Sequence, residues 1–248
     1  MNAPIYDQIG INYALKRQTE PRIATQIWNE LKGAGKILNI GAGAGSYEPH
    51  EGDLIALEPS SKMIAQRSKH ADPVVQGYAE SLPFEDKSFS HCMTILSMHH
   101  WKDRYKAFKE IKRVTEEKFI ALSWDPYAND FWLTRDYFPE IVEMDKLIFP
   151  EKEEFDAFFD NVRIERIMIP HDCRDGFLAA YWKKPEAYLE PSVRNSISTF
   201  SKISKLEDGL LKLKKDLESG EWERKNQEVL HQNEIDAGYI LISARIPS

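Results

Sequence analysis

The sequence contains few cysteines and no long apolar run. Its 248 residues include only two cysteines, Cys92 and Cys173, which excludes the dense disulfide framework of small secreted proteins. No stretch approaches the roughly 20 consecutive apolar residues that a membrane-spanning helix needs, and the N-terminus lacks the apolar core of a secretion signal. We therefore expect reduced thiols, a cytoplasmic location and no membrane association.

An excess of positive charge is also missing. With 33 Lys and Arg against 40 Asp and Glu, the formal net charge is −7, whereas proteins that bind nucleic acid usually carry a basic surface. The sequence thus predicts no nucleic-acid partner. His171, Asp172 and Cys173 are metal-ligand types, but three consecutive residues cannot close around an ion, so no metal site is predicted. The composition leaves the formation of a homo-oligomer open.

The sequence does contain an alternation of strand and helix patterns. Its 42% of hydrophobic residues are enough for a large core. Alternating strands and crossovers between residues 36 and 124 are typical of an α/β fold with a doubly wound, mostly parallel sheet. Residues 175–232 have only helical patterns, so we predict a Rossmann-like, seven-stranded sheet with a helical insertion before its last strand. The expected strands are 36–40, 53–58, 73–79, 91–97, 118–124, 162–169 and 237–246.

A glycine-rich turn follows the first expected strand, in ILNIGAGAGSYEPHEGDLIALEPS (37–60). The dinucleotide pattern G-x-G-x-x-G would need glycine at Ser46. Only seven residues separate Gly45 from Asp53, which is too few for the helix whose N-terminus holds a pyrophosphate. Glu58 ends the next strand, where a carboxylate can accept both ribose hydroxyls. This pattern favours an adenosine cofactor without phosphate, S-adenosylmethionine, over a nicotinamide dinucleotide.

Four stretches resemble class I S-adenosylmethionine-dependent methyltransferases of the ubiquinone-biosynthesis-like type. They are NIGAGAGSYE (39–48), IALEPSSKMIAQR (55–67), YAESLPFEDKSFSHCMTILSMHHW (78–101) and KEIKRVTEE (109–117). The third is the most specific, because its ESLPF segment followed by a strand and HHW is not expected of dehydrogenases. Residues 170–198 look like a subgroup of uncharacterised bacterial methyltransferases. The resemblance implies methyl transfer from S-adenosylmethionine, with S-adenosylhomocysteine as product.

The resemblance also implies cofactor-binding residues by position. Asn39 stands where the family often has an acid, so we expect a weaker anchor there for the amino group of the cofactor. Tyr78 replaces a frequent aspartate, so we expect Glu80 or backbone groups to recognise adenine N6. The implied residues are Gly41, Ala42 and Gly43 beneath the methionine and ribose, Glu58 on the ribose hydroxyls, Pro59 and Met63 against the adenine, Ala79 and Glu80 at its edge, Leu96 and Ser97 near the sulfonium, and Tyr13 and Arg17 in an N-terminal arm.

Two histidines are the candidate catalytic residues. His99 and His100 follow the fourth strand, on the side of the sheet where α/β sites form. Neighbours in an extended chain face opposite sides, and in a turn they diverge less but still differ. We therefore expect one histidine to act as general base near neutral pH and the other to hold the loop. His100 is slightly favoured for the base because it adjoins Trp101, which can wall the acceptor site.

These patterns together predict a methyltransferase that acts on a small-molecule acceptor. The alternatives are a non-catalytic S-adenosylmethionine-binding or regulatory protein on the same fold and, with less support, a nicotinamide-dependent oxidoreductase. We divide the chain into residues 1–32, an N-terminal arm and helix over the cofactor; 33–170, the methyltransferase core; 171–235, a helical lid or substrate lobe; and 236–248, the final strand of the core sheet.

Overall fold

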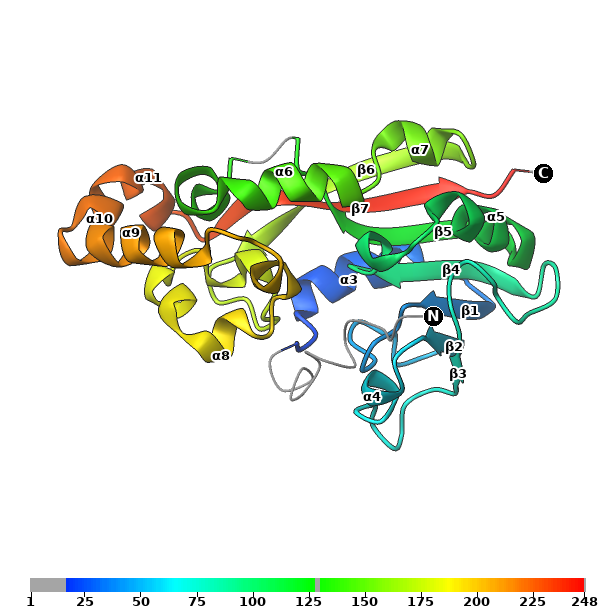
Figure 1. Ribbon diagram of the computed structural model, residues 1–248. Coiled ribbons are helices and arrows are strands. Elements are labelled where there is room, and N and C mark those ends of the chain that lie inside the picture. Colours follow the sequence, from blue (N-terminus) through cyan, green and yellow to red (C-terminus); the bar gives the residue numbers. More distant parts are fainter. Residues whose placement is uncertain (1–16, 128–129, 248) are drawn as a thin grey trace.

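A seven-stranded sheet forms the centre of the part of the protein that the structure describes. The computed structural model describes residues 17–127 and 130–247, and the strand order within them is β3-β2-β1-β4-β5-β7-β6 (Figure 1). Neighbouring strands are parallel, except that β7 runs antiparallel to β5 and β6. The predicted Rossmann-like sheet is therefore confirmed. The strands are β1 (Lys36–Ile40), β2 (Asp53–Glu58), β3 (Val74–Gln76), β4 (Phe89–Ile95), β5 (Thr115–Trp124), β6 (Asp160–Pro170) and β7 (Glu234–Arg245).

Helices cover both faces of the sheet. Successive strand residues point to opposite faces, so Ile37 packs with helix α3 (Pro21–Glu30) while Leu38 packs with α5 (Arg104–Val114) and α7 (Lys152–Asp156). Proline suits the first position of α3, because a helix leaves that N–H unpaired in any case. The connections after β1, β2 and β4 lie at the carboxyl edge of the sheet, where open α/β sheets bind ligands.

The helices between β6 and β7 form a lobe at one end of the sheet (Figure 1). A second segment after β5, with η2 (Leu133–Tyr137) and α6 (Pro139–Ile148), packs into the same lobe. Trp132 Nε1–H donates to the Trp182 carbonyl oxygen at 3.0 Å, and the Tyr137 hydroxyl donates to Asp216 at 2.9 Å. The lobe therefore includes residues that the sequence analysis placed in the core. Its other helices are η3 (Leu178–Tyr181), η4 (Pro185–Leu189), α8 (Pro191–Arg194), η5 (Ser198–Ser201), α9 (Leu206–Glu218), α10 (Glu221–Lys225) and α11 (Gln227–Leu230).

The predicted boundaries differ from the observed ones at strand ends. β5 starts at Thr115, three residues early and directly after α5, because Thr115 pairs with Phe89 of β4. β7 starts at Glu234, which pairs with Pro170 of β6. Between residues 17 and 247, apart from the two undescribed positions 128 and 129, no helix is long and apolar enough to cross a membrane.

Candidate active site

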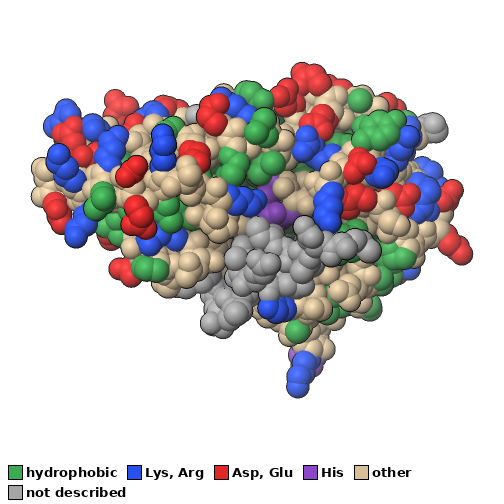
Figure 2. Space-filling model, in the orientation of Figure 1, with side chains coloured by type: hydrophobic (Ala, Val, Ile, Leu, Met, Phe, Trp, Pro, Cys, Tyr) green, Lys and Arg blue, Asp and Glu red, His purple; other side chains and the backbone are tan. Residues whose placement is uncertain are grey.

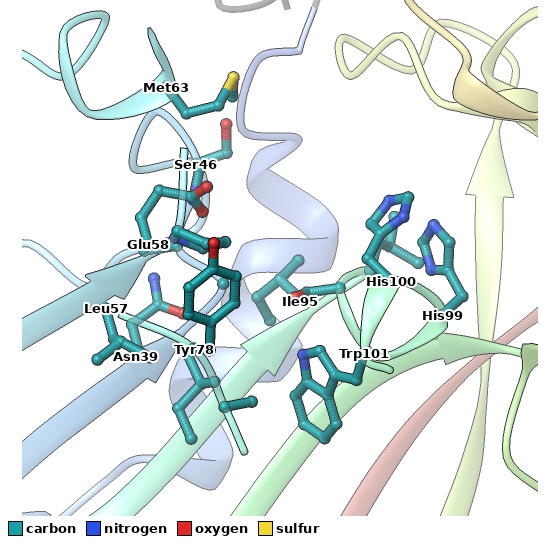
Figure 3. Close-up of a pocket in the computed structure, with 18 of the residues that line it drawn as sticks. Asn39, Ser46, Leu57, Glu58, Met63, Tyr78, Ile95, His99, His100 and Trp101 are labelled. Carbon is teal, nitrogen blue, oxygen red and sulfur yellow. The ribbon is translucent and has the colours of Figure 1, made fainter. Parts of the chain in front are cut away.

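A cavity of about 330 Å³ lies at the carboxyl ends of β1, β2 and β4. Its volume is in the usual range for small-molecule sites. Figure 3 shows Asn39, Glu58 and Tyr78 on one side of it and His99, His100 and Trp101 on the other. The predicted Tyr13 falls outside the described residues. All other residues predicted at the site line this cavity: Arg17, Gly41, Ala42, Gly43, Glu58, Pro59, Met63, Ala79, Glu80, Leu96, Ser97, His99 and His100.

The glycine turn brings bare backbone to the wall of the cavity. The N–H groups of Gly41 and Ala42 both donate to the Leu57 carbonyl oxygen, at 2.8 and 3.0 Å, which holds the turn over the end of β2. Gly41 has φ +69°, and a Cβ built on it would lie only 1.9 Å from Ser97 Oγ. Only glycine fits a position that is both left-handed and this close to a neighbour. As predicted, residues 41–52 contain no helix.

Glu58 is held rigidly at the end of β2. Its carboxylate accepts the Gly43 N–H at Oε2 and the Ser60 N–H at Oε1, each at 2.8 Å, and the residue is only 4% exposed. The Ser60 hydroxyl also caps helix α4 (Ser61–Ile64) by accepting the Met63 N–H. These two hydrogen bonds fix the orientation of the carboxylate at the wall of the cavity.

A buried ion pair supports the turn from behind. Arg67 donates to both oxygens of Glu48, at 3.0 and 2.8 Å, and Asn39 Nδ2 donates to the same carboxylate at 3.0 Å. Asn39 Oδ1 is buried and has no hydrogen-bond partner among the described residues. The Asn39 side-chain amide is thus held in one orientation, with Oδ1 as an acceptor that no described residue uses. The resemblance to a family that often has an acid at this position did not predict such an acceptor.

The segment after β3 offers one unpaired donor. The Ala79 N–H donates to no described residue, and Ala79 is 4% exposed on the cavity wall. The neighbouring Glu80 instead uses Oε1 to accept the N–H groups of Lys102 and Asp103, at 2.7 and 3.3 Å. Glu80 therefore ties two loops of the cavity together, whereas the Ala79 N–H is available to a ligand.

Asp175 joins three distant parts of the chain beside the cavity. Arg17 Nε donates to Asp175 Oδ1 at 2.6 Å, and the Tyr47 hydroxyl donates to Oδ2 at 2.9 Å. Asp175 is fully buried, and Tyr47 has φ +66° although it is not glycine. This network fastens Arg17 and the glycine turn to the lobe. The sequence analysis missed Asp175, because no local pattern marks a partner 128 residues away from Tyr47.

His99 and His100 both line this cavity, and the expected division of roles between them stays a prediction. They lie in the short helix η1 (Met98–His100), with ring centroids 3.9 Å apart. In a 3₁₀-helix neighbouring side chains are separated by about 120° rather than 180°. His99 also stacks on Phe149 at 4.7 Å, and its Nδ1 is buried without a partner among the described residues. Figure 2 shows histidine at the surface in the middle of one face, with basic side chains beside it.

Burial keeps both histidines neutral. Desolvation, followed by the nearby Lys202 and Arg17, lowers the pKa of His100 to about 3. Desolvation and then the charges of His100, Lys202 and Arg17 lower the pKa of His99 well below its ordinary value. Each imidazole is therefore a hydrogen-bond acceptor at pH 7 and a weaker base than the sequence analysis expected.

A second cavity of about 60 Å³ adjoins the first. Arg17, Leu96 and His99 line both cavities, so the two cavities are neighbours. Leu96 has φ +49°, a strained conformation that costs about 1–3 kcal/mol and is typical of functional sites. The remaining wall combines an acid with aromatic, aliphatic and hydroxyl groups: Asp145, Trp124, Phe149, Phe177, Tyr239, Leu178, Ile197, Ser198 and Thr199.

Asp145 is a buried acid with an unpaired oxygen. It is 3% exposed, and Oδ1 has no hydrogen-bond partner among the described residues. Desolvation raises the pKa of its carboxyl to about 7, against the effect of Lys202, which lowers it. A sequence signal existed: Ile141, Asp145 and Ile148 are spaced so that they share one helix face, and an acid in an apolar stripe is unusual.

We expect Asp145→Asn to stabilise the protein more at pH 8 than at pH 5. The folded state binds the Asp145 proton more tightly than the unfolded chain, whose pKa is near 3.8. Its contribution to stability is therefore lost as pH rises from about 4 through 7, and the two pKa values differ by the equivalent of roughly 4 kcal/mol. Urea unfolding of both proteins at each pH measures this difference. A difference independent of pH would show that Asp145 ionises normally.

The metal-ligand residue types and the two cysteine thiols contribute less to the chemistry of the site. Within 17–127 and 130–247, no three His, Cys, Asp or Glu residues lie close enough together to hold a metal ion. Burial raises the pKa of the Cys173 thiol to about 12, and that of the Cys92 thiol likewise to about 12. Since the thiolate is the reactive form, neither cysteine is suited to be a nucleophile.

Known proteins resemble this chain in sequence and in fold. Residues 38–120 match the family profile described as methyltransferase domain. A candidate methyltransferase from an antibiotic biosynthesis pathway of Anabaena variabilis has a crystal structure with 34% sequence identity and a TM-score of 0.83, covering 92% of this chain and 98% of that chain. A structure described as a possible histamine N-methyltransferase of Thermotoga maritima, 15% identical with a TM-score of 0.54, covers 98% of this chain and 96% of that one; it shares the fold.

Curated relatives match over shorter lengths. The uncharacterised methyltransferase YcgJ of Bacillus subtilis is 33% identical over 110 residues, which are 40% of this chain and 44% of that protein. The 2-methyl-6-phytyl-1,4-hydroquinone methyltransferase 2 of Oryza sativa is 26% identical over 148 residues, covering 53% of this chain and 41% of that protein. The chain thus spans less than half the length of these curated relatives.

The Anabaena relative, similar over almost its whole length, shows the family. The sheet order, with its antiparallel β7, is the order of that fold. The cavity also fits the family's methyl donor, since it combines bare backbone at Gly41, where a Cβ would clash, with a held carboxylate at Glu58 and an Ala79 N–H that donates to no described residue. The chain therefore belongs to the class I S-adenosylmethionine-dependent methyltransferases, and S-adenosylmethionine is its methyl donor.

Proposed function

We propose that the enzyme methylates a small molecule bound between η1 and the helical lobe. One observation carries this proposal: the second cavity shares Arg17, Leu96 and His99 with the wall of the first. Its far walls come from the lobe, through α6 and residues 177–178 and 197–199. A site enclosed in this way suits a small acceptor, whereas a macromolecule would need an open surface.

The cofactor contacts are proposed from the same geometry. Gly41 and Gly43 admit the methionine and ribose to the backbone, and the Glu58 carboxylate, which the Gly43 and Ser60 N–H groups hold at the cavity wall, accepts the ribose hydroxyls. The Ala79 N–H donates to the adenine ring, which lies against Pro59 and Met63. The unpaired Asn39 Oδ1 accepts a hydrogen bond from the amino group of the methionine moiety.

The residues near Leu96 position the acceptor. When bound, S-adenosylmethionine would supply a methyl group activated by a sulfonium: a lone pair of the acceptor would form the new bond to the methyl carbon as the S–CH₃ bond breaks, which releases neutral S-adenosylhomocysteine. Holding two reactants in line contributes roughly 7–11 kcal/mol in favourable cases. His99, which lines both cavities, is the better placed of the two histidines to accept a hydrogen bond from the acceptor. His100 lies beside it on the cofactor side.

We expect Glu58→Ala to weaken S-adenosylhomocysteine binding by about 1.5–3 kcal/mol, the usual value of hydrogen bonds to a charged group. The variant also leaves the N–H groups of Gly43 and Ser60 without their acceptor. Saturating S-adenosylmethionine should restore most of the turnover, because the ribose contacts change little between ground and transition states. Calorimetry measures the affinity, with the exposed Glu51→Ala as control. An unchanged affinity would place the ribose elsewhere.

A screen for turnover tests the proposed function. The enzyme is incubated with S-adenosylmethionine and a metabolite extract, and mass spectrometry follows S-adenosylhomocysteine and new products 14 Da heavier than their precursors, the mass of one CH₂ group. We expect such a pair to form with at least one small molecule. Binding of S-adenosylmethionine without product from any acceptor would instead support the regulatory alternative on the same fold.

A further inference from the structure

The second cavity combines aromatic walls with an unpaired acid. Trp124 and Phe149 meet edge to face at 5.7 Å, and the rings of Phe177 and Tyr239 lie 4.6 Å apart. All four are buried. The Trp124 Nε1–H is already bound to the Ala237 carbonyl oxygen at 2.7 Å, so this wall presents π faces and edges. Asp145 adds the only carboxylate among the described residues on this wall.

Such a combination attracts cations. A buried carboxylate without a partner is costly, and aromatic faces attract ammonium groups by about 0.5–2 kcal/mol. The cation already on the wall, Arg17, is neutralised by Asp175. Lys202 acts on the Asp145 carboxyl through its charge, but it is exposed and forms no ion pair with Asp145 in the described structure. The carboxylate therefore lacks a close counter-charge.

We propose that this cavity binds the protonated amine of the acceptor, with Asp145 as the anion that recognises it. The inference rests on the proposed function and adds the chemical class of the acceptor. The volume of about 60 Å³ is several times the roughly 15 Å³ that one water needs, which suits an alkylammonium end of about four heavy atoms. The rest of the acceptor extends past Leu96 and His99 toward the cofactor.

The lack of hydrogen bonds at Asp145 Oδ1 within the described structure favours a ligand-binding role over a structural one. A structural acid makes hydrogen bonds that its replacement would break, whereas Asp145 Oδ1 makes none within the described structure. Asp145→Asn is nearly isosteric and removes a buried charge. The variant should therefore melt at the same temperature as the wild type or higher, while losing the ligand. That combination separates a binding residue from a packing residue.

The first test measures binding of small probes in the presence of saturating S-adenosylhomocysteine. Propylammonium and its neutral isostere 1-propanol are titrated by NMR. We expect the wild type to prefer propylammonium by about tenfold or more, as for a hydrogen bond to a charged group, and Asp145→Asn to abolish the preference. The control is Glu143→Gln, an exposed acid on the same helix, which should bind both probes as the wild type does.

Lys202→Met tests the alternative that the Lys202 ammonium group, rather than an amine of the acceptor, is the partner of Asp145. If Asp145 is reserved for an ammonium from the acceptor, this variant should bind propylammonium as well as the wild type or better. Equal binding of amine and alcohol by the wild type, or unchanged preference in Asp145→Asn, would overturn the inference. So would a loss of stability in Lys202→Met that disappears in the double variant with Asp145→Asn, because Lys202 would then be the partner of Asp145.

Turnover separates this inference from the proposed function. Amine-bearing acceptors from the screen should show a KM at least about tenfold higher with Asp145→Asn, by the same charged hydrogen bond. If the wild type forms S-adenosylhomocysteine only with acceptors that lack a basic nitrogen, the amine site is wrong and methyl transfer stands. If propylammonium binding depends on Asp145 but no acceptor of any class is methylated, the proposed function fails and the amine site stands.

Discussion

Gly41→Ala should weaken S-adenosylhomocysteine binding by about 100-fold, or nearly 3 kcal/mol. The new Cβ would lie 1.9 Å from Ser97 Oγ and 2.7 Å from Ser97 Cβ, so the turn or the end of β4 must move. Forced repacking of this kind costs about 1–3 kcal/mol. The displacement falls at the point where the cofactor approaches bare backbone. Calorimetry measures the affinity.

Gly33→Ala is the matched control. Gly33 also has a left-handed backbone, with φ +80°, but nothing lies within 4 Å of its added Cβ. Both substitutions should therefore lower stability by about 1–2 kcal/mol through backbone strain, and only Gly41→Ala should affect the cofactor. Adding Ser97→Gly to Gly41→Ala removes both clashing atoms and should recover part of the affinity. If Gly33→Ala weakens binding as much, the effect of Gly41 is general instability.

His99→Ala should lower kcat by about 100-fold, at the lower end of the 10²–10⁴ range for general-base catalysis. The lower end is expected because a pKa well below its ordinary value makes a weaker base. His99→Asn keeps an acceptor near the place of the unpaired Nδ1 and should recover part of kcat. Affinity for S-adenosylhomocysteine should not change in either variant.

The pH profile tests whether the pKa of both histidines is lowered. A base with an unperturbed pKa would give an acid limb near pH 6.5, as the sequence analysis expected. With the pKa of His100 at about 3 and that of His99 also lowered, neither should produce an acid limb between pH 5 and 8. His100→Ala should reduce kcat less than His99→Ala. A few-fold effect in both variants would mean that positioning alone carries the reaction.

The residues expected to bind the cofactor could be predicted because they follow strands in fixed local patterns. Gly41, Glu58 and Leu96 stand at or next to the ends of β1, β2 and β4, and parallel pairing of these strands brings them to one edge. The short segment after Gly45 correctly excluded a helix there, since Pro49 and Gly52 interrupt it. The roles of these residues toward the cofactor stay predictions.

The acceptor half depends on contacts between segments far apart in the sequence. Asp175 meets Arg17 and Tyr47 only after the lobe has folded onto the sheet. Asp145 belongs to a segment assigned to the core, so its position in the apolar stripe of α6 was overlooked. Local pattern left open whether His99 and His100 lie in an extended chain or in a turn, and the structure places them in a 3₁₀-helix; the division of roles between them stays a prediction.

Calorimetry of the protein with S-adenosylhomocysteine, NAD and ATP, each in turn, tests the central claim most directly. The cavity offers bare glycine backbone and a fixed Glu58 carboxylate, and residues 41–52 contain no helix whose N-terminus could hold phosphates. We predict tight binding of S-adenosylhomocysteine that Glu58→Ala weakens, and little or no binding of NAD or ATP. Tight binding of NAD together with no response to S-adenosylhomocysteine would contradict the account.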